Sequence, residues 1–152
     1  MFTILPYSPE FKNGIARLLT DLWGLTLREC LTKFEKKYEH NPYDKGVYAI
    51  VAFHKNEIVG FRGFVPTKWL IKDKDLWVFL VADSIVSQKQ RRKGLFKTMT
   101  QIAIKELSNS KYSFFLNLTS NKHSYSRNLK MGWKELDKKK YHRFTSIKNL
   151  VL

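Results

Sequence analysis

The sequence predicts an α/β fold: a mixed sheet, mostly antiparallel with a central parallel pair, flanked by helices. Strand-like and helix-like segments follow one another in the order β, α, α, β, β, β, α, β, α, β. Tight polar turns join three apolar segments in the middle of the chain, and the last of these leads into an amphipathic helix. A length of 152 residues suits one domain that spans residues 1–152.

The N-terminal part of the chain is predicted to form one strand and two helices. The apolar run Phe2–Leu5 reads as a short strand. A helix begins after Ser8 and ends at Gly24, because apolar residues recur between them at helical spacing. A second helix is expected over Thr26–Glu39, followed by a turn at Asn41–Asp44.

Three strands are predicted next, over Val47–Phe53, Ile58–Ile71 and Leu76–Val86. Short polar turns separate them, so we expect an antiparallel meander. Gly60, Gly63 and Pro66 interrupt the second strand and predict a bend or bulge there. The third strand is the most continuously apolar, and we place it centrally, buried on both faces.

The C-terminal part is predicted to continue with a helix that begins after Gly94 and a strand over Tyr112–Leu118. A helical crossover makes that strand parallel to the strand before it. A short helix is expected over Ser120–Lys130, ended by Gly132. The tail from Trp133 offers residues for only one more strand.

The net charge of +15 is the strongest compositional signal. It suits nucleic acid, an anionic membrane surface or an anionic small ligand, and it also suits a generally basic soluble protein. No nucleic-acid fold signature accompanies the charge, and no apolar run is long enough to span a bilayer. The lone Cys30 cannot form an internal disulfide and the N-terminus lacks a secretory pattern, so we expect a cytoplasmic protein.

The segment from Val78 to Leu107 joins an apolar strand, a basic turn containing Gly94 and the start of a helix. The free N–H groups of a first helical turn, together with about half a positive charge from the helix dipole, favour phosphate binding at such a junction. We therefore expect this junction to bind a phosphate-bearing ligand.

The motif at this junction resembles the acetyl-CoA loop of the GCN5-related N-acetyltransferase (GNAT) superfamily. That loop reads Val-x-x-x-x-(Arg/Gln)-x-x-Gly-x-(Gly/Ala), and Val86, Arg91 and Gly94 follow it, whereas Phe96 departs at the last position. A second family pattern matches independently, with the family's spacing kept by Asn121, Ser124, Gly132 and Trp133. The element order agrees with both motifs, so the resemblance covers nearly the whole chain.

The resemblance implies that acetyl-CoA is the cosubstrate, with no metal. Loop amides would hold the pyrophosphate, and the backbone of the strand before the loop would bind pantetheine. A backbone N–H near Ile85 or Val86 would stabilise the oxyanion. The residues expected to bind acetyl-CoA are Ser84, Ile85, Val86, Arg91, Arg92, Lys93, Gly94, Leu95, Phe96, Asn121 and Ser124.

The catalytic residues expected from the resemblance are Asp83, Tyr125 and Asn128. Asp83 is the only acid on its strand and stands where the family often has Asp. It is either the base that takes the amine proton, with ordered water as the alternative base, or a structural acid or substrate anchor. Family members often protonate the thiolate with a Tyr at the position of Asn128, and Tyr125 could substitute for it or simply pack on the sheet.

Three functions follow from the sequence. The first is acetyl transfer to an amine of a small molecule or peptide in a ternary complex. The second is CoA binding without turnover, and the third is a basic nucleic-acid-binding module. The candidates for contacting the acceptor are Trp23, Tyr38, Tyr43, Arg62 and Trp69. Since the family's sheet ends with one more strand than this chain offers, we expect either a shortened sheet or a partner, such as a second copy, at that edge.

Overall fold

The computed structural model describes residues 1–108, 110–112, 114–118 and 122–135. Its internal contacts divide the chain into two units, Met1–Leu118 and Thr119–Leu152, and each unit is described by itself. The domain prediction, one domain over 1–152, stays a prediction.

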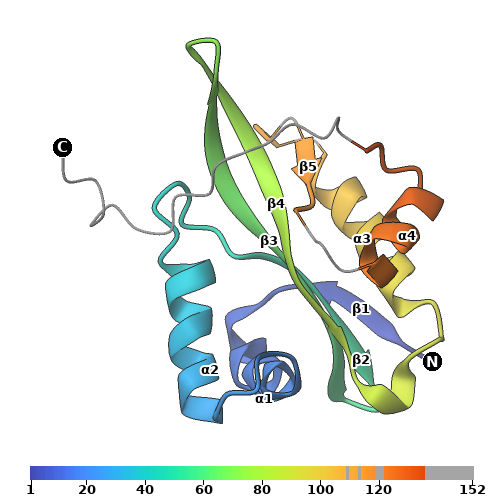
Figure 1. Cartoon of the computed structure of the whole chain (residues 1–152). Helices are drawn as coiled ribbons and strands as arrows, with labels where there is room; N and C mark the ends of the chain where they lie inside the picture. Colours follow the sequence, from blue (N-terminus) through green and yellow to red (C-terminus); the bar gives the residue numbers. More distant parts are fainter. Residues whose placement is uncertain (109, 113, 119–121, 136–152) are drawn as a thin grey trace. The chain divides into compact units, whose positions relative to one another are not determined.

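The first unit contains a sheet of five strands in its described part, in the order β1-β2-β3-β4-β5. Neighbouring strands are antiparallel except β4 and β5, which are parallel. This arrangement confirms the predicted meander and the parallel pair (Figure 1). The strands are β1 Thr3–Pro6, β2 Tyr48–His54, β3 Glu57–Ile71, β4 Lys74–Val86 and β5 Phe114–Leu116.

Helices cover both faces of this sheet (Figure 1). On one face lie α1 (Lys12–Trp23), which follows the single turn η1 (Pro9–Phe11), and α2 (Leu27–Phe34), which continues into the π-helical turn η2 (Glu35–Glu39). On the other face lies α3 (Leu95–Leu107), preceded by the short turn η3 (Gln88–Gln90).

Local signals account for the ends of the first two helices. Gly24 ends α1 in the left-handed conformation (φ +64°), as its position predicts. Thr26 begins α2 with a capping box, in which its hydroxyl accepts from the Glu29 N–H and the Glu29 carboxylate accepts from the Thr26 N–H.

The central strand is β3, so the prediction that β4 is central is wrong; β4 contributes to the hydrophobic cluster on each face, but most of its residues are only partly buried. The whole run Val59–Phe64 of β3 is buried, whereas in β4 only Val78, Phe79 and Ile85 are. The position of β3 in the middle of the sheet, with a hydrophobic cluster on each face, accounts for its long buried run.

The second unit contains α4 (Lys122–Lys130), which confirms the predicted short helix, and Gly132 ends it with φ +88°. The strand predicted in the tail falls on residues 136–152, outside the described residues. Within the described part of the chain, no helix is long and apolar enough to cross a membrane.

Candidate active site

The β4–α3 junction has the backbone geometry of an anion site. Arg92 and Gly94 both take left-handed conformations, with φ +65° and +80°. Gly94 is the N-cap of α3, and no side chain caps the helix. The positive φ of Gly94 favours glycine there, and a Cβ at this position would meet nothing within 4 Å, so the space beside it is open. The start of α3 is thus available to an anion.

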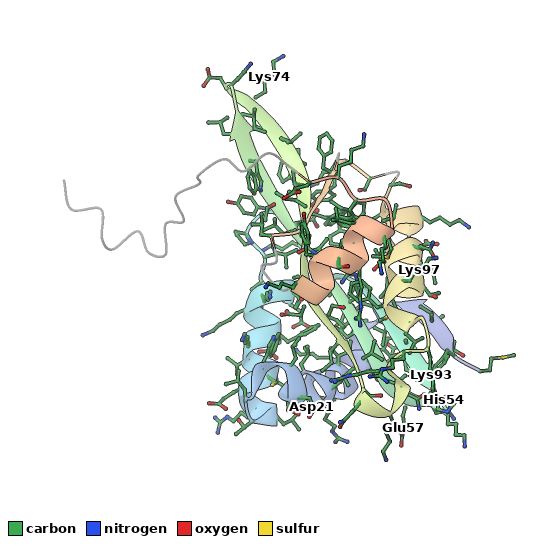
Figure 2. All side chains as sticks on the ribbon, turned by 45° about the vertical axis from the view of Figure 1, so that its right-hand side comes forward. Asp21, His54, Glu57, Lys74, Lys93 and Lys97 are labelled. Atoms are coloured by element: carbon green, nitrogen blue, oxygen red, sulfur yellow. The ribbon has the colours of Figure 1, made fainter. Side chains whose placement is uncertain are left out.

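The charged side chains of the junction are partly engaged within it. Arg91 donates from Nε to the Val86 carbonyl (3.2 Å), and Lys93 donates from Nζ to Gln90 Oε1 (2.7 Å). Arg92 is exposed. Figure 2 shows Lys93 at the end of the sheet where His54 and Glu57 of the β2–β3 turn also lie, and Lys97 on α3. Backbone N–H groups of the first turn of α3 could thus offer directional hydrogen bonds to an anion, and the partly engaged cations could add a positive field.

The last part of β4 has no neighbouring strand on its β5 side within the described residues. Pairing with β5 covers only Val78–Leu80, so the segment Val81–Val86 presents backbone N–H and C=O groups along that edge. Ser84, Ile85 and Val86 all lie in this segment. An unpaired strand edge can bind an extended, amide-containing ligand by strand-like hydrogen bonds.

A β-bulge in β4 aims Asp83 toward α1 and α2. Arg62 is paired with Ser84 and Phe64 with Val81, so Ala82 and Asp83 together stand opposite Gly63. This confirms the irregularity predicted at the glycines of β3, although the extra residue lies in β4. Bulges are common beside active sites because they redirect a side chain, and here both extra residues face the cluster beneath α1 and α2.

Three donors hold the Asp83 carboxylate. Trp23 Nε1 donates to Oδ1 (3.1 Å), and Lys37 Nζ and Tyr38 Oη both donate to Oδ2 (2.7 Å each). Burial raises the pKa of Asp83, but the charge of Lys37 and the hydrogen bonds outweigh it, so the pKa lies below the ordinary value of an aspartate. Asp83 is therefore a carboxylate at neutral pH, with an ion pair to Lys37.

Two local features allow this network to form. Lys37 and Tyr38 are adjacent in sequence, and the wide π turn of η2 brings both onto one carboxylate. Gly63 lies against Tyr38 so closely that any Cβ there would overlap the tyrosine hydroxyl. Glycine at this position thus makes room for the Tyr38–Asp83 hydrogen bond.

On the opposite face of the sheet, Arg62 lies under the start of α3. Its guanidinium packs against the Phe96 ring at 4.3 Å and lies 5.9 Å from the Phe64 ring. Bulk at position 96, the departure from the family's loop motif, is therefore matched by the arginine beneath it. Cation–π contacts of this kind are worth about 0.5–2 kcal/mol.

Comparison with known proteins now gives the family. The model of the acetyltransferase (GNAT) domain matches residues 6–135. The chain belongs to the GNAT acetyltransferase family. This confirms the resemblance drawn from the loop motif and the element order.

Solved GNAT structures share the fold. An acetyltransferase from Trypanosoma brucei is 15% identical with a TM-score of 0.71, the match covering 95% of this chain and 100% of that one. AAC(6')-Iy bound to a bisubstrate analogue of CoA and acetylneamine is 15% identical (TM-score 0.74, 96% and 99% covered). Glucosamine-6-phosphate N-acetyltransferase from Arabidopsis thaliana is 16% identical (TM-score 0.69, 95% and 99% covered). A search of curated protein sequences gives no match.

Within this GNAT fold, the predicted CoA-loop residues lie together at one junction of the first unit. Ser84, Ile85 and Val86 lie on the open segment of β4, and Arg91 to Phe96 form the loop and the first turn of α3. Asn121 lies outside the described residues, as does the side chain of Ser124. The described residues contain no cluster of three or more His, Cys, Asp or Glu that could hold a metal.

The predicted thiol-protonating residues lie in the second unit. Asn128 is buried, and its Oδ1 has no hydrogen-bond partner among the described residues. Tyr125 is exposed, and a hydrogen bond to the Glu135 carboxylate raises the pKa of its hydroxyl. The two side chains therefore differ in burial, although their spacing put them on roughly the same face of a helix.

The structure also adds a residue that sequence reasoning missed and separates the acceptor candidates. Lys37 was not predicted, and no local pattern marks it, because its partner lies on a distant strand. Trp23 and Tyr38 meet at Asp83, whereas Arg62 faces α3. The other two candidates, Tyr43 and Trp69, are at least partly exposed, in the turn after η2 and in the outer part of β3.

Proposed function

We propose that this protein is an acetyl-CoA-dependent N-acetyltransferase that acts on an amine of a small molecule or peptide in a ternary complex. The observation that carries the proposal is the pairing of an uncapped helix start at Gly94 with the open β4 segment before it. The first feature suits a pyrophosphate, and the second suits the amides of pantetheine. Family membership supports the same reading.

In this proposal most contacts to acetyl-CoA come from backbone groups. The N–H groups from Arg92 to Phe96 hold the pyrophosphate, and Ser84 and Val86 hold the pantetheine arm. When bound, acetyl-CoA supplies a thioester whose carbonyl carbon bonds to the amine nitrogen as the carbon–sulfur bond breaks and the amine loses a proton. A backbone N–H near Ile85 or Val86 stabilises the charge that develops on the carbonyl oxygen.

The geometry favours Asp83 as a structural acid or substrate anchor rather than the general base, with water taking the amine proton. A lowered pKa makes a carboxylate a weaker base, and the three donors occupy both carboxylate oxygens. The base role of Asp83 stays a prediction, and the Asp83→Asn variant described in the Discussion tests it. For the leaving thiolate, Asn128 and Tyr125 stay the candidates.

The acceptor in this proposal carries negative charge. An open groove of about 520 Å³ runs along α2 and η2, and its lining is Arg28, Glu29, Thr32, Lys33, Lys36 and Lys37. Four of these side chains are basic and one is acidic. The groove adjoins β4 through the ion pair of Lys37 with Asp83. A phosphorylated amino sugar, the type of substrate that one structural neighbour's name states, would suit such a groove better than a cationic aminoglycoside.

A direct test is calorimetry with acetyl-CoA, followed by thiol release with an amine panel that contains phosphorylated amino sugars, aminoglycosides and lysine peptides. We expect acetyl-CoA to bind and the anionic amines to give the highest kcat/KM. Absence of CoA binding would refute the proposal. Absence of thiol release with every amine, despite tight CoA binding, would favour a second function.

That second function is CoA binding without turnover. Asn128 motivates it, because the family often has a tyrosine at this position and an amide cannot supply the same proton. An Asn128→Tyr variant makes the comparison direct. If the wild type binds CoA without releasing thiol and the variant gains release, the missing tyrosine is the cause.

A further inference from the structure

Arg62 has an unusual environment for an arginine. Its relative exposure is 1%, and Nε and Nη2 have no hydrogen-bond partner among the described residues. Across the strands it is paired with Ser84, whose buried Oγ also has no partner there. Buried polar groups in native structures almost always have partners, so three such atoms on two neighbouring residues call for an explanation.

The positive charge makes the case stronger. Burial lowers the pKa of Arg62 to about 10, so the guanidinium is still protonated at neutral pH. The Phe64 and Phe96 rings contact it but cannot accept in-plane hydrogen bonds from Nε and Nη2. A buried charge without a counter-ion is costly, and none of the ion pairs among the described residues includes Arg62. An anionic acceptor would neutralise the charge, whereas a neutral carbonyl would satisfy a hydrogen bond and leave the charge.

The position of these atoms in the fold indicates which kind of anion would pair with Arg62. Ser84 lies two residues before Val86 on the open β4 segment, where the proposed function puts pantetheine and the thioester. Phe96, whose ring packs against Arg62, lies in the first turn of α3, where the proposed function puts the pyrophosphate. The unpartnered groups thus lie at Ser84, next in the strand to the residues near which the proposed function puts the acyl carbonyl. Nε and Nη2 form the parallel fork of a guanidinium, which matches the two oxygens of a carboxylate.

We propose that Arg62 and Ser84 form a subsite for a carboxylate at the far end of the acyl group, so that the preferred donor is the CoA thioester of a dicarboxylic acid, such as malonyl- or succinyl-CoA. The inference rests on the proposed function and specifies its acyl donor. The bonds made and broken are those of acetyl transfer, and the distal carboxylate is unchanged. Phe96 then has a role, because it holds the guanidinium in place from the α3 side.

The first test compares ligands on the wild-type protein by calorimetry and by the rise in melting temperature, with CoA, acetyl-CoA, malonyl-CoA and succinyl-CoA as the probes. We expect one of the carboxylated thioesters to bind about tenfold or more tightly than acetyl-CoA. Equal or weaker binding of both would overturn the proposal, while leaving the N-acetyltransferase proposal intact. If none of the four ligands binds, the proposed function itself fails.

The second test uses Arg62→Met, which keeps much of the length and removes the charge, with the exposed Arg17→Met as matched control. We expect Arg62→Met to weaken the favoured carboxylated thioester about 10- to 100-fold and to change the affinity for acetyl-CoA and CoA by less than about threefold. An equal loss for all ligands would mean that the guanidinium contacts a part that they share, which would overturn the proposal.

A third variant keeps the test informative if Arg62→Met does not fold. Ser84→Ala removes one hydroxyl from the same pair, and circular dichroism checks its fold. We expect the ratio of affinities, carboxylated thioester over acetyl-CoA, to fall by about 3- to 10-fold. An unchanged preference among the four ligands would contradict the subsite.

Discussion

The Asp83→Asn substitution tests the network that joins β4 to α1 and η2. Asparagine has the same shape as aspartate but no charge. Its NH2 group is itself a donor, so it cannot accept the hydrogen bonds that one of the two carboxylate oxygens accepts. Hydrogen bonds to a charged group contribute about 1.5–3 kcal/mol and those between neutral groups about 0.5–1.5 kcal/mol. The Trp23 and Tyr38 bonds therefore lose roughly 1 kcal/mol each. The side chain of Lys37 is 34% exposed, so its ion pair adds less than 1 kcal/mol. We expect a loss of about 2–3 kcal/mol in the free energy of unfolding at pH 7.

The assay is urea unfolding followed by tryptophan fluorescence, because Trp23 itself bonds to Asp83. The pKa of Asp83 is lower in the folded state, so its stabilisation is full above about pH 4 and is lost as the pH falls through the folded-state pKa. The difference between wild type and variant should therefore shrink at pH 3. The matched control is Asp21→Asn, an exposed aspartate on α1 (Figure 2). An unchanged free energy of unfolding at pH 7, or a difference that grows in acid, would refute this reasoning.

The same variant separates the two roles of Asp83 in catalysis. If Asp83 is the general base, kcat should fall by about 10²–10⁴-fold, and the pH profile of kcat should lose its decline at acidic pH. If it is an anchor, kcat should fall far less at a temperature where the variant is folded. We expect the second outcome, because the carboxylate is already held by three donors.

Three further substitutions have expected outcomes. Gly94→Ala strains a left-handed residue by about 1–2 kcal/mol and should weaken acetyl-CoA binding in calorimetry, whereas Gly24→Ala, with similar strain at the end of α1, should lower only the melting temperature. Gly63→Ala overlaps both the hydroxyl and the ring of Tyr38 and should cost about 1–3 kcal/mol in urea unfolding, with only part of that loss absent when Tyr38→Phe, which keeps the ring, is the background. Thr26→Ala removes the capping box of α2 and should lower stability by about 1 kcal/mol with unchanged acetyl-CoA affinity, and a larger loss of affinity would contradict a purely structural cap.

The strand order and the phosphate-binding junction could be predicted from the sequence because their signals are local. Turn residues separate the strands, Gly24 and Gly94 mark helix ends, and a helical crossover makes β5 parallel to β4. The resemblance to the family motif then predicted acetyl-CoA as the ligand of this junction. These features depend on the order of residues over short distances, which a sequence displays directly.

The parts that could not be predicted depend on contacts between distant segments. The bulge at Ala82 and Asp83 shifts the alternation of β4, so that Val81 and Val86 share one face and Ala82 and Ile85 the other. The strand is therefore apolar on both faces, and this pattern predicts deeper burial than the structure shows, because most of the strand's residues are only partly buried. Arg62 had no local sign of burial either, since its environment is made by β4 and by α3.

The open segment Val81–Val86 has a consequence for the protein before any ligand binds. An unpaired strand edge offers the same N–H and C=O groups to another polypeptide as to a ligand, and it can template edge-to-edge association of chains. The net charge of +15 opposes such association, because like-charged chains repel each other. Ionic strength, which screens that repulsion, should then govern how long the ligand-free protein stays monodisperse, and a bound ligand that occupies the edge should remove this dependence on salt.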